Sequence, residues 1–178
     1  MNLNNINNYN EDEFYLKYRK ALSGLQNSQF TGSKKCLVFD FDNCLINLMK
    51  IQMEIYHTQQ LPIEMVEQFL DTYTELAEPI RTTWDIIYRS QDTIIILSGN
   101  KYENILKWLV KHNRDKYIND IISIWDLNQD VAQKKFQKLK FLSEVYDKVT
   151  FFDDSLENLV INAGLKNVEL MKVTPEII

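Results

Sequence analysis

This sequence has few cysteines, few glycines and no excess of basic residues, and each shortage excludes a class of protein. The 178 residues include two cysteines, Cys36 and Cys44, which are too few for a disulfide framework. With no metal-binding pattern beside them, we expect free thiols in a reducing compartment and hence a cytoplasmic location. The four glycines never have the G-x-G-x-x-G spacing, which excludes the usual dinucleotide-binding fingerprint.

Long apolar runs are also missing. No stretch approaches the ~18 apolar residues of a membrane span, so we expect no membrane partner. The opening "MNLNNINNYN" lacks the basic start and apolar core of a signal peptide, and we expect a disordered, Asn-rich tail there. The net charge of -5 gives no overall attraction for nucleic acid.

The size and apolar content suit one compact domain. The chain is 45% hydrophobic and 12% aromatic, enough for a sizeable core. Residues 1–33 are predicted to form a tail and a leading helix over 11–27. Residues 34–178 are predicted to form the main domain, in which residues 47–90 form a helical insert or small cap.

Five short runs rich in Val, Ile and Phe alternate with helical patterns. Uniformly apolar runs are typical of strands that are covered on both faces, as in parallel sheets. Alternating strands and helices therefore predict an α/β fold with a doubly wound, mainly parallel five-stranded sheet and at most a small helical cap. The predicted strands are 36–40, 93–97, 121–125, 149–153 and 168–172, and the predicted helices are 48–58, 62–77, 80–90, 101–112, 130–146 and 155–163.

Acidic and small polar residues stand where three of these strands end. Asp40 and Asp42 follow the first strand, Ser98 follows the second, and Asp153 and Asp154 end the fourth. In a doubly wound sheet these carboxyl ends meet at one crevice, where ligands bind. A single Asp after a strand is often only a helix cap, but a paired set at two strand ends favours a functional site.

Carboxylates gathered in one place repel each other unless a cation or protons neutralise them. Oxygen ligands favour Mg²⁺ over zinc, since neither His57 nor His112 lies beside the acidic residues in the sequence. The sequence therefore predicts a Mg²⁺ cofactor.

Four motifs in this order, "VFDFDNCL", "IIILSGN", a lysine-bearing helix start and "TFFDDSLENL", resemble the haloacid dehalogenase (HAD) superfamily of phosphohydrolases. The resemblance covers roughly residues 35–165. It implies a HAD-like Rossmannoid catalytic domain over 34–178 and a Mg²⁺-dependent phosphomonoester hydrolase that works through an aspartyl-phosphate.

The resemblance also implies roles for particular residues. Asp40 would be the nucleophile, and Asp42 would be the general acid and then the base that activates water. Ser98 and Gly99 would bind the phosphoryl group. Asp154, Asp40 and the backbone carbonyl of Asp42 would bind Mg²⁺. These residue types suit the chemistry, because a carboxylate attacks phosphorus only when the phosphoryl charge is masked.

The site also needs one lysine from the helix predicted over 130–146. Lys135 lies four residues after Val131 and four before Leu139, on the apolar face, and is the first choice. Lys138 is the second choice, and the adjacent Lys134 stays open.

Two further residues of the last motif are predicted to support the site. Asp153 would orient the lysine. Asn158 would act around the metal ligands, or equally would be a plain residue of the helix surface. The chain also departs from the usual "DxDGT": Asn43 replaces Gly, which Asn can do because it tolerates a left-handed turn. Cys44 replaces Thr and is a weaker hydrogen-bond donor.

The sequence leaves the substrate open. We expect a phosphorylated substrate, such as a nucleotide or another phosphorylated metabolite. The alternative is a polynucleotide 3'-phosphatase, and a non-catalytic phospho-binding module such as a receiver domain fits the order of the acids poorly. Tyr56, Arg81 and Trp84 are candidate substrate contacts, although core packing is favoured for the two aromatic residues. Basic groups that would guide nucleic acid are Lys101, Lys107, Lys111, Arg114 and Lys116.

Overall fold

The computed structural model describes residue 16 and residues 34–126 and 130–175. The predicted tail and leading helix of residues 1–33 therefore lie outside the described residues, apart from Leu16. Within the described part, no helix has the length and apolar character that crossing a membrane requires.

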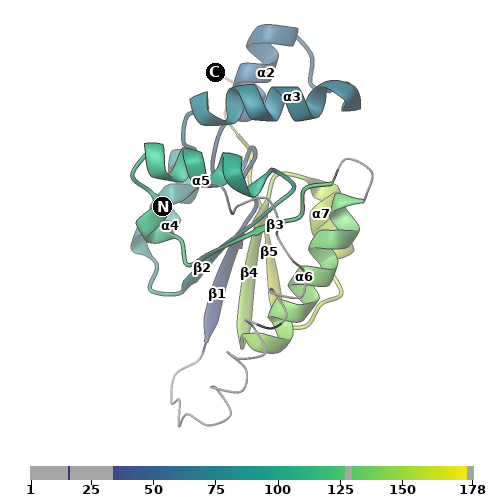
Figure 1. Cartoon of the computed structure of the whole chain (residues 1–178). Coiled ribbons are helices and arrows are strands. Elements are labelled where there is room, and N and C mark those ends of the chain that lie inside the picture. Colours follow the sequence, from purple (N-terminus) through teal and green to yellow (C-terminus); the bar gives the residue numbers. More distant parts are fainter. Residues whose placement is uncertain (1–15, 17–33, 127–129, 176–178) are drawn as a thin grey trace.

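A five-stranded, fully parallel sheet forms the centre of the molecule (Figure 1). The strand order is β3-β2-β1-β4-β5, so the first strand lies in the middle and the chain winds outward in both directions. The prediction of a doubly wound α/β sheet is confirmed. The strands are β1 (Lys35–Phe39), β2 (Thr93–Ser98), β3 (Asp120–Ser123), β4 (Lys148–Asp153) and β5 (Val168–Lys172).

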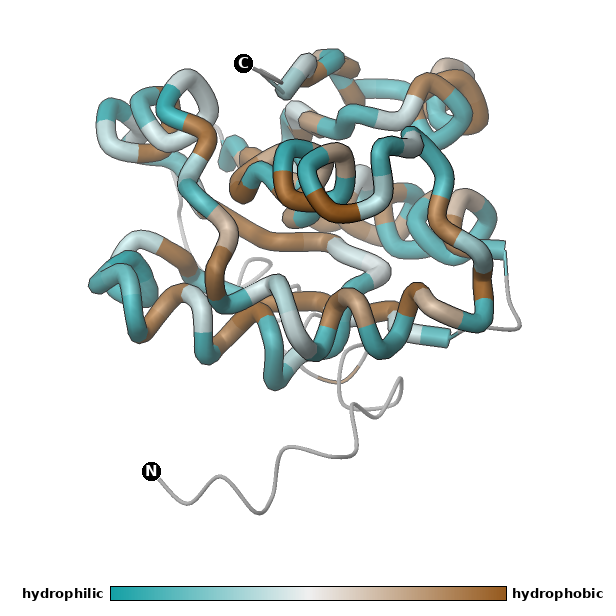
Figure 2. The backbone as a smooth tube through the Cα atoms, turned by 90° about the horizontal axis from the view of Figure 1, so that it is seen from above, coloured by the Kyte–Doolittle hydropathy of each residue, from teal (hydrophilic) through white to brown (hydrophobic). Residues whose placement is uncertain are grey.

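Alternate side chains of the strands enter two separate cores. Val38 belongs to the core under α6 (Val131–Val145) and α7 (Leu156–Ile161). Phe39 belongs to the core under α4 (Arg81–Arg89) and α5 (Tyr102–Lys111), on the opposite face. Both faces are therefore covered, which explains the uniformly apolar strands. In Figure 2 the helices around the sheet alternate between hydrophobic and hydrophilic residues along their length, as amphipathic helices do.

A small helical insert lies beyond the carboxyl ends of the strands (Figure 1). It comprises α2 (Leu48–Tyr56), α3 (Ile63–Tyr73) and the 3₁₀ turn η2 (Thr74–Leu76). Two buried tryptophans anchor its two ends to the main domain. Trp84 Nε1 donates to the Leu45 carbonyl at 2.9 Å, and Trp108 Nε1 donates to the Ala77 carbonyl at 2.8 Å.

Several elements end earlier than predicted. The third strand stops at Ser123, two residues before the predicted end. The helix predicted over 48–58 ends at Tyr56, because His57 takes a left-handed conformation with φ 51°. The helix predicted over 62–77 changes at Tyr73 into the 3₁₀ turn η2, and a further 3₁₀ turn, η3 (Asp115–Tyr117), was not predicted.

Candidate active site

Three carboxylates meet where β1 and β4 end. Asp40, Asp153 and Asp154 each offer an oxygen, and these oxygens lie within 4.8 Å of one another. The backbone N–H of Asp40 donates to the Phe152 carbonyl at 2.9 Å, which extends the pairing of the two strands to the site. Asp40 and Asp153 are buried and Asp154 is half-buried.

The ammonium group of Lys135 forms ion pairs with two of these carboxylates. Its ammonium nitrogen lies 2.9 Å from Asp40 Oδ1 and 2.8 Å from Asp153 Oδ2. The side chain comes from α6 and is only 1% exposed, although it is charged. Lys138 is buried on the same helix, whereas the half-buried Lys134 pairs with Asp126 at 3.7 Å. Lys135, the first choice from the sequence, therefore contacts the carboxylates of the site.

Two donors besides the lysine hold Asp153. Its Oδ1 accepts a hydrogen bond from the backbone N–H of Ser155 at 2.8 Å, and its Oδ2 accepts one from Asn158 Nδ2 at 3.0 Å. Asn158 is itself buried, so it is not a plain residue of the helix surface. This arrangement fixes the carboxylate against which Lys135 rests.

Asp42 lies beside the cluster but outside the three-carboxylate group. β1 ends at Phe39 and the chain bends at Phe41, so Asp40 and Asp42 do not lie on one extended strand. The Phe41 carbonyl accepts hydrogen bonds from the backbone N–H groups of the turn that follows, including that of Leu45 at 2.9 Å. The Asp42 carboxyl group is half-buried and accepts a hydrogen bond from Asn100 Nδ2 at 2.8 Å.

Burial raises the pKa of three carboxyl groups of the site, those of Asp40, Asp42 and Asp154. It raises the pKa of Asp42 to about 7, with a further contribution from the charge of Asp40. Burial and the charge of Asp153 raise the pKa of Asp154 to about 6. Burial also raises the pKa of Asp40 well above its ordinary value, against the attraction of Lys135. A neutral Asp42 at moderate pH is the state that a general acid requires.

Lys135 stays charged in spite of its burial. Burial by itself lowers the pKa of a lysine, but Asp40 and Asp153 raise the pKa of Lys135 above its usual value. When the three carboxylates are ionised, this single positive charge leaves an excess of two negative charges. A dication with a preference for oxygen ligands matches that excess, so the residues present fit Mg²⁺.

Ser98 stands at the end of β2, on the strand next to β1. Its side chain is fully buried, and its Oγ accepts a hydrogen bond from the backbone N–H of Asn100 at 3.0 Å. Because that bond uses the hydroxyl oxygen as an acceptor, it leaves the hydroxyl hydrogen for another acceptor. Gly99 follows Ser98 at the half-buried turn between β2 and α5.

The unusual pair Asn43 and Cys44 fits the turn after Asp42. Asn43 has φ 60°, the left-handed conformation that Gly would supply, and its Oδ1 accepts a hydrogen bond from the backbone N–H of Met49 at 2.6 Å. Cys44 is buried, and its thiol donates to the Phe152 carbonyl at 3.5 Å. Its thiol is therefore directed at the backbone of β4.

The other candidate contacts have mostly structural partners. Trp84 is 1% exposed and belongs to the core, as the sequence favoured, and Tyr56 packs against Phe69 within the insert. Arg81 is exposed and lines a pocket of about 580 Å³ with Lys50, Glu78 and Thr174 among other residues.

Several of the predicted basic groups are paired with acids. Lys107 pairs with Glu103 at 2.8 Å, and Lys111 pairs with Glu75 at 3.6 Å. Lys101 pairs with two acids of α3. These pairs reduce the positive field that a polynucleotide would meet.

Sequence reasoning missed the role of Asn100 in the site. Asn100 is fully buried and contacts both Asp42 and Thr74 of the insert. Asn100 was not among the residues predicted for the site. The motif "LSGN" does contain Asn100, at the end of a predicted strand. Its partner Thr74, however, lies in a distant segment that carries no motif, so the contact between them could not be predicted.

Comparisons with known proteins define the class by fold. No protein-family model matches the sequence, and no curated protein matches it. A HAD-family enzyme from Bacteroides thetaiotaomicron, solved with magnesium and inorganic phosphate, is 16% identical and has a TM-score of 0.52, over 79% of this chain and 94% of that one. A candidate phosphoglycolate phosphatase from Lactobacillus plantarum is 15% identical, with a TM-score of 0.51 over 78% and 86% of the two chains.

A dehalogenase also has this fold. L-2-haloacid dehalogenase from Xanthobacter autotrophicus is 10% identical, with a TM-score of 0.52 over 77% of this chain and 76% of that one. The chain therefore has the fold of the HAD superfamily hydrolases. Because the matching structures include both phosphatases and a dehalogenase, the reaction has to be argued from the site.

Proposed function

We propose that this protein is a Mg²⁺-dependent phosphomonoester hydrolase of the HAD superfamily that works through an aspartyl-phosphate on Asp40. The observation that supports this most directly is the buried Lys135 ammonium held between Asp40 and Asp153 beside the third carboxylate, Asp154. With Mg²⁺ bound, the ion and Lys135 together would offset the charge of the three carboxylates, which the approach of a dianionic phosphoryl group requires.

The first step transfers the phosphoryl group to the protein. An Asp40 carboxylate oxygen forms a bond to phosphorus while the bond between phosphorus and the leaving oxygen breaks. Asp42, neutral at moderate pH because of its raised pKa, gives its proton to that leaving oxygen. Ser98 donates its hydroxyl hydrogen to a phosphoryl oxygen, and Lys135 balances negative charge at Asp40 and Asp153.

The second step returns the protein to its starting state. The Asp42 carboxylate takes a proton from water, and the water oxygen bonds to phosphorus as the bond to Asp40 breaks. Inorganic phosphate leaves, Asp40 is again a carboxylate, and Asp42 is again protonated.

Asp40, Asp154 and the backbone carbonyl of Asp42 are the groups proposed to hold Mg²⁺. When bound, the ion would mask phosphoryl charge and would stabilise the ionised carboxylates of Asp40 and Asp154. Asp153 is proposed to orient Lys135, and Asn158 to hold Asp153 in place.

A substrate panel tests this function. Phosphorylated metabolites, nucleotides, 3'-phosphorylated oligonucleotides, 4-nitrophenyl phosphate and a 2-haloacid are each incubated with Mg²⁺ or with EDTA. We expect phosphate release that needs Mg²⁺ and is lost in Asp40→Asn, with Glu103→Gln as the matched surface control. Halide release without phosphate release, or full phosphatase activity of Asp40→Asn, would overturn the proposal.

A further inference from the structure

Asn100 is held more tightly than a helix cap requires. Its backbone N–H donates to Ser98 Oγ at 3.0 Å, and its carbonyl accepts a hydrogen bond from Ser123 Oγ at 2.6 Å. Ser98 ends β2 and Ser123 ends β3, so the backbone of Asn100 is fixed at the carboxyl ends of two strands. Its side chain is fully buried.

The contacts of the side-chain amide determine which way it faces. Asn100 Oδ1 lies 2.8 Å from the backbone nitrogen of Lys101 and accepts a second hydrogen bond from Asn104 Nδ2 at 3.1 Å. A backbone N–H can only donate, so the atom facing it must be the amide oxygen. The amide NH₂ therefore faces Asp42 Oδ1 at 2.8 Å and Thr74 Oγ1 at 3.0 Å.

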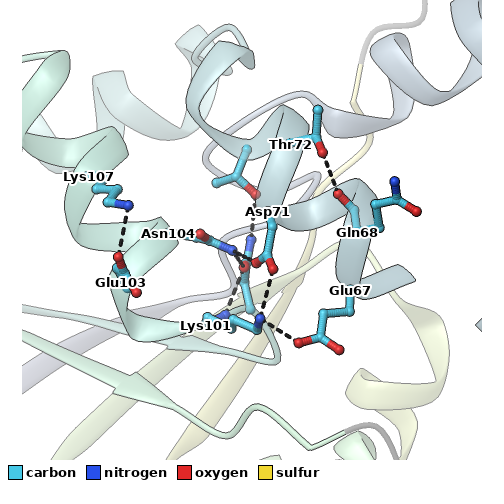
Figure 3. Close-up of polar contacts among 10 residues, drawn as sticks. Glu67, Gln68, Asp71, Thr72, Lys101, Glu103, Asn104 and Lys107 are labelled. Carbon is cyan, nitrogen blue, oxygen red and sulfur yellow. Dashed lines mark hydrogen bonds and ion pairs between the residues drawn. The ribbon is translucent and has the colours of Figure 1, made fainter. Parts of the chain in front are cut away.

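The same network continues into the helical insert. Asn104 Nδ2 donates to Asp71 Oδ1 at 2.9 Å, and Lys101 Nζ contacts Asp71 Oδ2 at 2.9 Å and Glu67 Oε1 at 2.7 Å (Figure 3). Thr74, which receives the other amide hydrogen, is buried in the 3₁₀ turn at the end of α3. Asn100 is thus clamped between the start of α5 and the insert.

Resting on the proposed function, we propose that Asn100 is a positioning residue that holds Asp42 in the orientation for proton transfer to the leaving group. In a protonated carboxyl group the carbonyl oxygen is the better acceptor. The N–H of Asn100 on Oδ1 therefore leaves the proton of Asp42 on Oδ2, and the fixed amide sets the rotation of the carboxyl group. Asn100 acts through Asp42, and its anchoring to Thr74 makes the insert part of this arrangement.

The positioning role of Asn100 can be tested by how the rate of hydrolysis depends on the leaving group of the substrate. A nitrophenolate leaves without a proton, whereas phenolate, a stronger base, needs one from Asp42 as it leaves. Loss of correct positioning should therefore slow the hydrolysis of phenyl phosphate much more than that of 4-nitrophenyl phosphate. A general loss of structure would slow both equally.

The experiment measures kcat and KM for a series of aryl phosphates with Mg²⁺. The variants are Asn100→Asp, which keeps the shape but removes the donor, Asn100→Ala, Thr74→Val and Asp42→Ala, with Glu103→Gln on α5 as the surface control. For both Asn100 variants we expect kcat for phenyl phosphate to fall about 10- to 100-fold more than kcat for 4-nitrophenyl phosphate, with KM changed less than about 3-fold. Thr74→Val should give a smaller change of the same kind.

The outcomes separate this proposal from the function on which it rests. Equal losses for all leaving groups in folded Asn100→Asp or Asn100→Ala would overturn the positioning role, and so would a wild-type leaving-group dependence in Asp42→Ala. If neither Asn100 variant folds, the folded Thr74→Val decides by the same comparison. A wild-type protein that hydrolyses none of the series would instead contradict the proposed function.

Discussion

Lys135 is the residue on which the charge balance of the site depends. Its ammonium group is almost fully buried and contacts Asp40 and Asp153. Removing one partner of a buried ion pair leaves an uncompensated charge, which costs about 3–5 kcal/mol. Lys135→Met should therefore lower the free energy of unfolding by about that amount in EDTA at about pH 8, as measured by urea denaturation.

A control for this change lies on the same helix. Lys140 is exposed, and Lys140→Met should change the free energy of unfolding by less than about 0.5 kcal/mol. Equal stabilities of the Lys135 and Lys140 variants would contradict the proposed role of Lys135 in balancing the carboxylates.

The raised pKa values of the acids predict how stability depends on pH. Burial raises the pKa of Asp42 to about 7 and that of Asp154 to about 6, from 3.8 in the unfolded chain. Between these values the folded state holds protons that the unfolded state has released. The free energy of unfolding should therefore fall as pH rises from about 4 to about 7, by up to about 1.4 kcal/mol per pH unit and per proton.

This dependence is measurable by denaturation in EDTA across that pH range. Addition of Mg²⁺ should flatten the dependence, because a cation bound to Asp40 and Asp154 stabilises the ionised form. Stability that rises with pH in EDTA over the same range would contradict the raised pKa values.

Asn43, in the turn after β1, supports the start of α2. Asn43 combines a left-handed φ of 60° with a hydrogen bond to the backbone N–H of Met49 at the start of α2. Asn43→Gly keeps the conformation but loses this bond, and should cost about 1 kcal/mol. Asn43→Ala loses the bond and also strains the backbone, and should cost about 1–2 kcal/mol more.

Thermal denaturation of the two variants checks this order. The melting temperature should decrease from wild type to Asn43→Gly and again to Asn43→Ala. If the alanine variant melted as high as the glycine variant, the left-handed turn would not be needed. The hydrogen bond of Asn43 to Met49 links the turn after Asp42 to α2, the first helix of the insert.

The elements themselves could be predicted where the hydrophobic period was clear. The run "TIIIL" is covered on both faces, and it became β2 with only its end misplaced, at Ser98. Element ends were harder, because His57 and Tyr73 stop their helices through backbone conformation and a change to a 3₁₀ turn, which hydrophobic spacing does not show. The inward face of α6 was clear enough to select Lys135.

At the scale of the whole molecule, topology made the candidate site predictable. A parallel, doubly wound sheet brings the ends of β1, β2 and β4 together, so Asp40, Ser98 and Asp153 could be grouped from the sequence. Contacts between these ends and the insert could not be predicted, because they depend on how α3 packs against α5. The bond of Asn100 to Thr74 is of this kind.

Two kinds of polar contact hold the insert to the residues at the start of α5. Lys101 holds α3 through Glu67 and Asp71, at side chains that are partly exposed. Exposed ion pairs contribute about 0–1 kcal/mol each, so these contacts hold α3 weakly compared with the buried bond of Asn100 to Thr74.

The proposed mechanism requires Asp40 to carry the phosphoryl group during turnover. Acid quenching of the wild-type protein during turnover of an aryl phosphate with Mg²⁺, followed by peptide mass spectrometry, tests it directly. We expect a phosphoryl group on Asp40 in the wild-type protein and none in Asp40→Asn, which should also be inactive. A phosphoryl group on another residue, or an Asp40→Asn variant with wild-type turnover, would contradict it.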